Sequence, residues 1–184
     1  MLTRFDLYKT IQAAAVLLKT TDGKRMSRLR LVKLLYIADR ESIAETEVPI
    51  TGDSVVAMKH GPVLSQTYNL IKGETFAAHD WERYFRSSGQ DVELEVDPGF
   101  ERLSRYDIRK LRTVAERFRD ENEWDIVEHT HQFPEWLENY VEGTSRPISA
   151  TDVLEALGMS EDAPEILAEA KSRRQVDRAL ARVR

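Results

Sequence analysis

The sequence predicts a mainly α-helical fold of the α+β class, in which a single helical domain carries a small antiparallel β-hairpin or sheet. Two observations support this class. Apolar residues recur at i, i+3, i+4 and i+7 in several segments, which places them on one face of a helix. Residues 91–96 instead alternate acidic and apolar side chains, which is the period of a half-exposed strand. We expect residues 1–160 to form the domain and residues 161–184 to add a basic C-terminal helix packed on it.

The composition indicates a soluble globular protein. Charged residues make up 32% of the 184 positions, hydrophobic residues 41%, and the formal net charge is -5. The chain has no cysteine, which excludes disulfides, zinc-thiolate sites and thiol nucleophiles. No run approaches the roughly 20 apolar residues of a membrane span, and the first residues lack the apolar core of a secretory signal. We therefore expect a cytoplasmic protein with no membrane contact.

The first helix is predicted to begin at a capping box formed by Thr3 and Asp6. Gly23 predicts its end. The apolar residues that follow the cap at helical spacing are Leu7, Ile11, Ala14, Ala15 and Leu18.

A basic segment leads from the first helix to the second. It holds five cations and no acid: Lys24, Arg25, Arg28, Arg30 and Lys33. Such a segment is either the solvated start of a helix or a docking patch for an acidic partner or a phosphate backbone. The sequence leaves both interpretations open.

The second helix is predicted to start after Ser27, which occupies the N-cap position. Its apolar stripe, which should face the core, consists of Leu31, Leu34, Leu35 and Ala38. Lys33, Asp39 and Arg40 fall outside this stripe, and we expect their side chains in solvent.

A short strand and a third helix follow. Residues 55–59 are β-prone, and Gly61-Pro62 is predicted to open the helix, because proline suits the first helical turn. Leu64, Tyr68 and Ile71 should line one face of this helix. Gly73 predicts its end.

The second half of the chain is predicted to hold a β-hairpin and further helices. Residues 81–86 and 91–96 flank the turn at residues 87–90. Ser104 and Asp107 form a capping box before an amphipathic helix that reaches Phe118. The remaining predictions are helices at 124–130, from Pro134, from Ser149 to Gly158 and at 164–183, with a loop at 143–147. The segment from Lys171 to Arg184 has six basic residues and one acid.

The candidates for catalysis or metal binding are few. His129 and His131 lie near Glu128 and Glu135, which are suitable ligand types. Residues at i and i+2 diverge by about 200° around a helix, so a structural role is favoured over a metal or acid/base site. His60 is expected at a strand end, bonded to nearby backbone. We predict no enzymatic activity, no metal and no cofactor, because no nucleophile elbow or phosphate-binding loop occurs.

Large aromatic residues gather in two segments, the hairpin and residues 124–140. Most should belong to the core, and any that remain exposed would be natural anchors for a protein partner. They are Trp81, Tyr84, Phe85, Trp124, Phe133, Trp136 and Tyr140.

Four motifs in this order give the chain a resemblance to a known family. They are KLLYIADR at 33–40, PITGD at 49–53, VAMKHGPVLSQTYNLIKGE at 56–74 and THQFPEW at 130–136. The set resembles the Panacea domain of SocA-like antitoxins. The matching motif positions are Lys33, Tyr36, Met58, Lys59, His60, Gly61 and Pro62, and we add Trp81 and Trp136 as partner-binding candidates.

The resemblance implies an antitoxin of a bacterial or phage toxin–antitoxin pair. Its partner would be a toxin that is encoded by the adjacent gene and neutralised by direct contact. Resemblance to the founding member of the family also implies that the chain could deliver the toxin to an ATP-dependent protease. One alternative is a nucleic-acid-binding regulator that uses the Lys24–Lys33 patch or the basic tail, although the net acidity counts against it. Another is a hydrolase-like enzyme built on Glu128 and His129.

Overall fold

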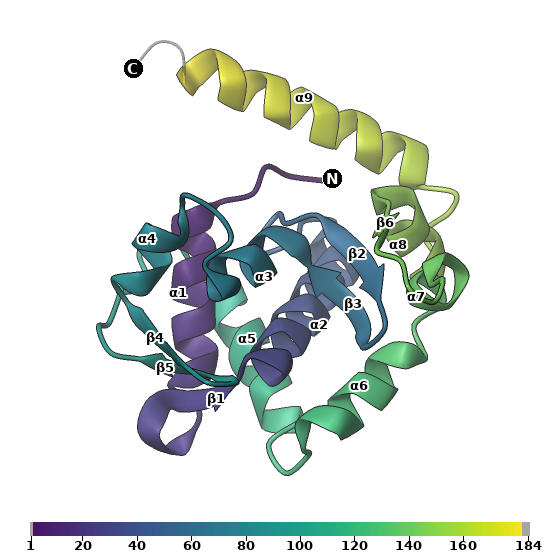
Figure 1. Ribbon diagram of the computed structural model, residues 1–184. Helices are drawn as coiled ribbons and strands as arrows, with labels where there is room; N and C mark the ends of the chain where they lie inside the picture. The colour runs from purple at the N-terminus through teal and green to yellow at the C-terminus, as the bar shows by residue number, and fades with distance from the viewer. Residues whose placement is uncertain (1, 182–184) are drawn as a thin grey trace.

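The computed structural model describes residues 2–181, except for the side chains of residues 177, 178, 180 and 181. Its helices are α1 (Leu7–Leu18), α2 (Arg28–Thr46), α3 (Ser65–Lys72), α4 (Ala78–Glu82), α5 (Arg105–Arg117), α6 (Glu123–His131), α7 (Pro134–Asn139), α8 (Ala150–Ala156) and α9 (Ala163–Ala181). Its strands are β1 (Arg25–Ser27), β2 (Val55–Met58), β3 (Gly61–Leu64), β4 (Phe85–Ser88), β5 (Asp91–Leu94) and β6 (Arg146–Ile148). The predicted class, mainly α with small antiparallel sheets, is confirmed (Figure 1).

Helix α2 lies at the centre of the molecule, with α1, α5, α6 and β3 packed around it (Figure 1). Ser27 caps it by accepting a hydrogen bond of 3.2 Å from the backbone N–H of Arg30. All four residues of the predicted apolar stripe are buried. The expectation that Lys33 and Asp39 face solvent is wrong, and Arg40 is largely covered too. Neighbouring elements pack on several sides of α2, so residues outside the apolar stripe are buried as well.

The strands form two antiparallel sheets, with orders β1-β5-β4 and β3-β2-β6. The predicted hairpin is confirmed as β4 and β5, in which Phe85 pairs with Leu94. Its bounds differ from the prediction, because Ser87 and Ser88 belong to β4 rather than to the turn, and residues 81 and 82 belong to helix α4. Strand β1 adds to the other side of β5 through the pair Met26 and Val92. Val92 and Leu94 are buried, whereas Val96 lies beyond the end of the strand and is exposed.

The prediction that Gly61-Pro62 opens a helix is wrong, because these residues begin strand β3. Pro62 pairs with Ala57 of β2, and β3 is the outer strand of its sheet. An outer strand tolerates proline because its missing N–H can lie on the unpaired side. Helix α3 therefore starts three positions later, at Ser65, and ends at Gly73 as predicted, with φ 74° there.

The first helix differs from its prediction at both ends. Asp6 alone caps α1 by accepting a hydrogen bond of 3.0 Å from the N–H of Lys9, so the predicted box with Thr3 is not formed. The helix ends at Leu18 rather than near Gly23. The Thr20 and Thr21 hydroxyls donate to the carbonyls of the last turn, which supports the earlier end.

The later predictions are largely confirmed. The Ser104–Asp107 capping box is present, and the helices near residues 124, 134, 149 and 164 occur as α6 to α9. The predicted loop at 143–147 is wrong in part, because Arg146–Ile148 forms β6 against the free side of β2. A local sequence pattern carries no information about a partner strand so far away in the chain.

The C-terminal elements form a second apolar cluster beside β2. Ala57 of β2 packs there with Trp136, Ile148 and Leu154. Helix α9 joins this cluster near its start and then runs past the N-terminal segment (Figure 1). The division at residue 160 stays a prediction, and Arg182 and Arg184 of the basic tail lie outside the described residues. Within residues 2–181, no helix combines the length and apolarity that a membrane span requires.

Candidate functional site

Lys33, the first motif residue on α2, is turned into the protein. Its side chain is 0% exposed, and its ammonium group donates a hydrogen bond of 2.8 Å to the carbonyl of Pro62. Gly61 lies against the same group: a Cβ atom there would sit 2.8 Å from Nζ of Lys33. Burial lowers the pKa of Lys33 to about 7, because the charged form loses its hydration. Lys33 therefore links α2 to β3.

Tyr36 links α2 to α7. Its hydroxyl donates a hydrogen bond of 2.6 Å to Oε1 of Glu135, a residue that is 0% exposed. Arg40, one turn further along α2, donates from Nε to the same oxygen at 2.7 Å, and its guanidinium lies 4.3 Å from the ring centre of Phe133. Burial, followed by the nearby Glu135 carboxylate, raises the pKa of Tyr36. The buried carboxylate is therefore neutralised by a cation and also held by a neutral donor.

Asp39 links α2 to the PITGD segment. Its Oδ1 accepts hydrogen bonds of 2.9 Å from the N–H groups of Ile50 and Thr51, and its Oδ2 accepts one from the Thr51 hydroxyl. Burial raises the pKa of Asp39 to about 7, although these hydrogen bonds oppose the rise. The carboxyl group fixes the turn that leads into β2.

Asp53, at the end of the same segment, caps helix α3 from outside the helix. It accepts hydrogen bonds of 2.7 Å from both the N–H and the hydroxyl of Thr67, and one of 3.0 Å from the N–H of Gln66. These N–H groups belong to the first turn of α3 and have no partner within the helix. A negative charge also suits that end of the helix dipole.

These contacts give the motif residues a structural role. Lys33, Tyr36 and Asp39 connect α2 to segments that lie 29, 99 and 12 positions away in the chain. The sequence reasoning missed this set, yet a signal was present: each partner segment is itself one of the motifs that carried the resemblance. The shared motif thus builds a scaffold around α2.

A cavity of about 200 Å³ lies beside this scaffold, where α2, β2 and the start of α8 meet. Its polar wall includes Asp39 and Arg40, whose hydrogen bonds to Thr51 and Glu135 are already made within the protein. The rest of the wall is mostly apolar and includes Ile43, Val55 and Val153. The cavity therefore offers an incoming group chiefly apolar contacts.

The two histidines near Glu128 pack against aromatic rings. His129 contacts the rings of Phe118 and Phe133 edge-on, with centroids 5.0 and 5.3 Å away. His131 stacks on Trp136 at 4.1 Å, and burial lowers its pKa. Among the described residues, no group of three or more metal-ligand side chains is placed to hold a metal ion. Both imidazoles therefore take part in aromatic packing, and a structural role for them stays a prediction.

The remaining candidates divide into buried and exposed residues. Trp81 is 1% exposed and packs on Phe85, so its place is in the core rather than at a partner surface. Trp136 is also buried, and its indole N–H donates to the carbonyl of Met58 at 2.9 Å. Met58 is half-buried, whereas Lys59 and His60 are exposed at the turn between β2 and β3.

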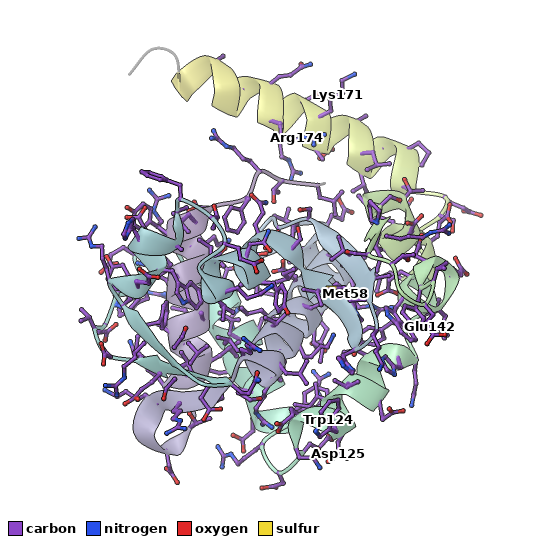
Figure 2. The ribbon with its side chains drawn as sticks, viewed as in Figure 1. Met58, Trp124, Asp125, Glu142, Lys171 and Arg174 are labelled. Carbon is purple, nitrogen blue, oxygen red and sulfur yellow. The ribbon has the colours of Figure 1, made fainter. Side chains whose placement is uncertain are left out.

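Trp124 is the exposed aromatic residue beside that turn. Its side chain is 55% exposed and meets the His60 ring edge-on, with centroids 5.3 Å apart. Figure 2 shows Trp124 on α6, below Met58 of β2 in this view. The sequence placed Trp124 among the aromatic residues but gave no sign that it, rather than Trp81, would be exposed.

The Lys24–Lys33 segment does not form one basic surface. Lys33 is buried, and the Arg30 guanidinium donates to the carbonyls of Phe118 and Glu121. Arg25 is paired with Asp91. Lys33 and Arg30 therefore fit neither the solvated start nor the docking patch, and a phosphate backbone would find fewer free charges there than the sequence suggested.

Comparison with known families gives a match that spans this scaffold. The sequence model of the family described as "Antitoxin SocA-like, Panacea domain" matches residues 31–137, more than half of the chain. Comparison with curated proteins and with solved structures gives no match. The family supports an antitoxin role and, in general terms, a toxin as partner. The chain belongs to the SocA-like antitoxin family and carries its Panacea domain.

Proposed function

We propose that this chain acts in the cytoplasm as the antitoxin of a bacterial or phage toxin–antitoxin pair and neutralises its toxin by direct protein–protein binding. The family match over residues 31–137 is the observation that carries the proposal. Direct binding requires no catalytic group on the antitoxin, only a surface that covers the toxin's active site or holds the toxin inactive. Such a surface must be sought among exposed residues, because Lys33 and Tyr36 of the motif are buried.

The surface of the molecule is large enough for such an interface. A specific interface of ordinary size buries roughly 800 Å² on each partner. The accessible surface of the chain is 10206 Å², so an interface of that size takes up a small part of it. Members of one family can therefore share the scaffold and differ in the surface that meets each toxin.

The test is co-expression with the open reading frame next to this gene. We expect that the neighbour alone arrests growth, that this chain restores growth, and that the two proteins copurify as a stable complex. The matched control is the same plasmid with Leu34→Asp, which places a charge at a buried core position and should abolish rescue. A harmless neighbour, or rescue without a complex, would contradict the proposal.

Delivery of the toxin to an ATP-dependent protease is the finer form of the proposal that the family resemblance implies. It differs from simple neutralisation in the lifetime of the toxin. If the chain is an adaptor, the toxin's half-life after a translation block should shorten when the chain is present, and only in cells that retain the protease. If the half-life lengthens or stays constant, the chain neutralises by binding alone.

A further inference from the structure

The outer face of α6, together with the β2–β3 turn, holds an aromatic group that the fold leaves uncovered. Trp124, Glu128 and His131 follow one another at i, i+4 and i+7, so they lie along one stripe of α6. His60 of the turn meets Trp124 edge-on, and His131 stacks on Trp136. We call the four residues Trp124, Glu128, His131 and His60 the α6 face. Figure 2 shows Trp124 near the end of the molecule opposite α9.

Packing within the chain does not account for the exposed indole of Trp124. A tryptophan usually buries most of its large apolar surface, yet this one is 55% exposed. Helix α6 is anchored by other residues, namely the buried Ile126, Val127 and Thr130. Removal of the indole should therefore leave the fold intact. Exposed tryptophans of this kind are typical anchors of protein interfaces.

The segment that carries the α6 face is strongly acidic in sequence. Residues 120–142 contain eight acids and neither lysine nor arginine. The acids are Asp120, Glu121, Glu123, Asp125, Glu128, Glu135, Glu138 and Glu142. Within the described part of the chain, only Glu135 among these acids pairs with a lysine or arginine, namely Arg40. Glu128 lies 3.8 Å from the His131 ring, and burial lowers the pKa of that histidine.

Elsewhere on the surface, acids are commonly matched by cations. Asp91 pairs with Arg25, and Asp97 pairs with Lys19. Some acids of α6 have a local purpose: Asp125 completes a capping box with Asn122 at the start of the helix. Glu128 lies late in the helix, where a carboxylate caps no N–H group, and it is exposed. Its carboxylate is therefore available to a partner.

We propose that the α6 face is the surface that binds the toxin and that the toxin meets it with a basic surface. The inference rests on the proposed function and adds the place and the chemistry of the contact. Trp124 would supply the apolar anchor, and the surrounding carboxylates would supply charge complementarity, which speeds association and selects the partner. The turn also exposes the cation Lys59, which the three acids of α6, Glu123, Asp125 and Glu128, outnumber.

The experiment measures binding of the purified full-length chain to the purified product of the adjacent gene at low and high salt. We expect Trp124→Ala to weaken binding by at least about tenfold at both salt concentrations. Glu128→Lys should slow association at low salt and have little effect at high salt. Circular dichroism and thermal unfolding should match the wild type, since both side chains are exposed.

Two matched controls lie away from this face. Phe76→Ala removes an aromatic ring that is 95% exposed, and Glu155→Lys reverses an exposed charge on α8. Both control variants should bind as the wild type does. If the wild type binds and Trp124→Ala binds equally well, or if a control variant loses more affinity, the inference about the surface is overturned while the antitoxin proposal stands. If the wild type itself does not bind the toxin, both the inference about the surface and the antitoxin proposal are contradicted.

Discussion

The Tyr36 hydroxyl donates a hydrogen bond of 2.6 Å to Glu135, a carboxylate 99 positions away in the chain. This contact joins the K-L-L-Y helix to the F-P-E-W segment, the first and last motifs of the family resemblance. Arg40 holds the same carboxylate from the next turn of α2. Because Glu135 is buried, its partners decide whether the charge is tolerated. The family motif can thus be tested as a structural device, independently of any toxin.

Tyr36→Phe removes one donor from the buried Glu135 and should lower the free energy of unfolding by about 1.5 to 3 kcal/mol. Urea denaturation measures this loss. Tyr106→Phe is the matched control, because its hydroxyl also donates to a carboxylate, Glu45, but in an exposed setting. The control should cost less than about 1 kcal/mol. Equal losses for the two variants would contradict the buried role of Tyr36.

Gly61→Ala should destabilise the protein by about 2 to 5 kcal/mol. The backbone of Gly61 has φ +90°, and a Cβ atom would lie 2.6 Å from Oγ1 of Thr130 and 2.8 Å from Nζ of Lys33. The cost therefore has two causes, the positive φ and the close contacts of the added carbon. Gly89→Ala separates them, because Gly89 has φ +62° but no atom within 4 Å of the added carbon. That variant should lose only about 1 kcal/mol. If both variants lose the same free energy of unfolding, the close contacts at Gly61 contribute nothing to its cost.

Lys33→Met should reveal a stability cost that depends on pH. The pKa of Lys33 is about 7 in the folded protein and 10.5 in the unfolded chain, so folding disfavours the charged form. Measured relative to the Met variant, the wild type should lose stability as pH falls from about 10.5 to about 7, by a few kcal/mol, and then change little. Urea denaturation between about pH 6 and pH 10 measures the difference. A constant difference over that window would show that Lys33 stays hydrated.

Asp39→Asn should reveal a pH dependence of stability opposite in direction to that of Lys33. The pKa of Asp39 rises from 3.8 in the unfolded chain to about 7 in the folded protein, so folding disfavours the carboxylate. Relative to the Asn variant, the wild type should lose stability as pH rises from about 3.8 to about 7, and the difference should then level off. An opposite slope would mean that the three hydrogen bonds to Asp39 outweigh its burial.

Local patterns predicted many elements of this fold correctly. The Ser104–Asp107 capping box and the apolar stripe of α2 occur as expected, and the hairpin occurs with a shorter turn than predicted. Each of these features depends on residues within a few positions of one another. Their energetics are therefore set largely by the nearby sequence.

The candidate site was predicted less well, because exposure depends on distant segments. Trp81 and Trp124 look alike in the sequence, yet the first is buried against Phe85 and the second meets solvent beside His60. The resemblance singled out the motif around Lys33 but did not distinguish a scaffold role from a contact role. The hydrogen bonds of α2 make that distinction.

The fold class, most helices, the absence of cysteine chemistry and the family resemblance could all be inferred from residue patterns. The folded chain was needed to show that Lys33 and Asp39 are buried, that Gly61-Pro62 forms a strand and that Trp124 is exposed. Each of these outcomes depends on contacts with other segments of the chain, and the buried charges show this most directly. A charged group enters the interior only when partners from elsewhere in the chain satisfy it, as Pro62 does for Lys33, and those partners meet it only in the folded protein.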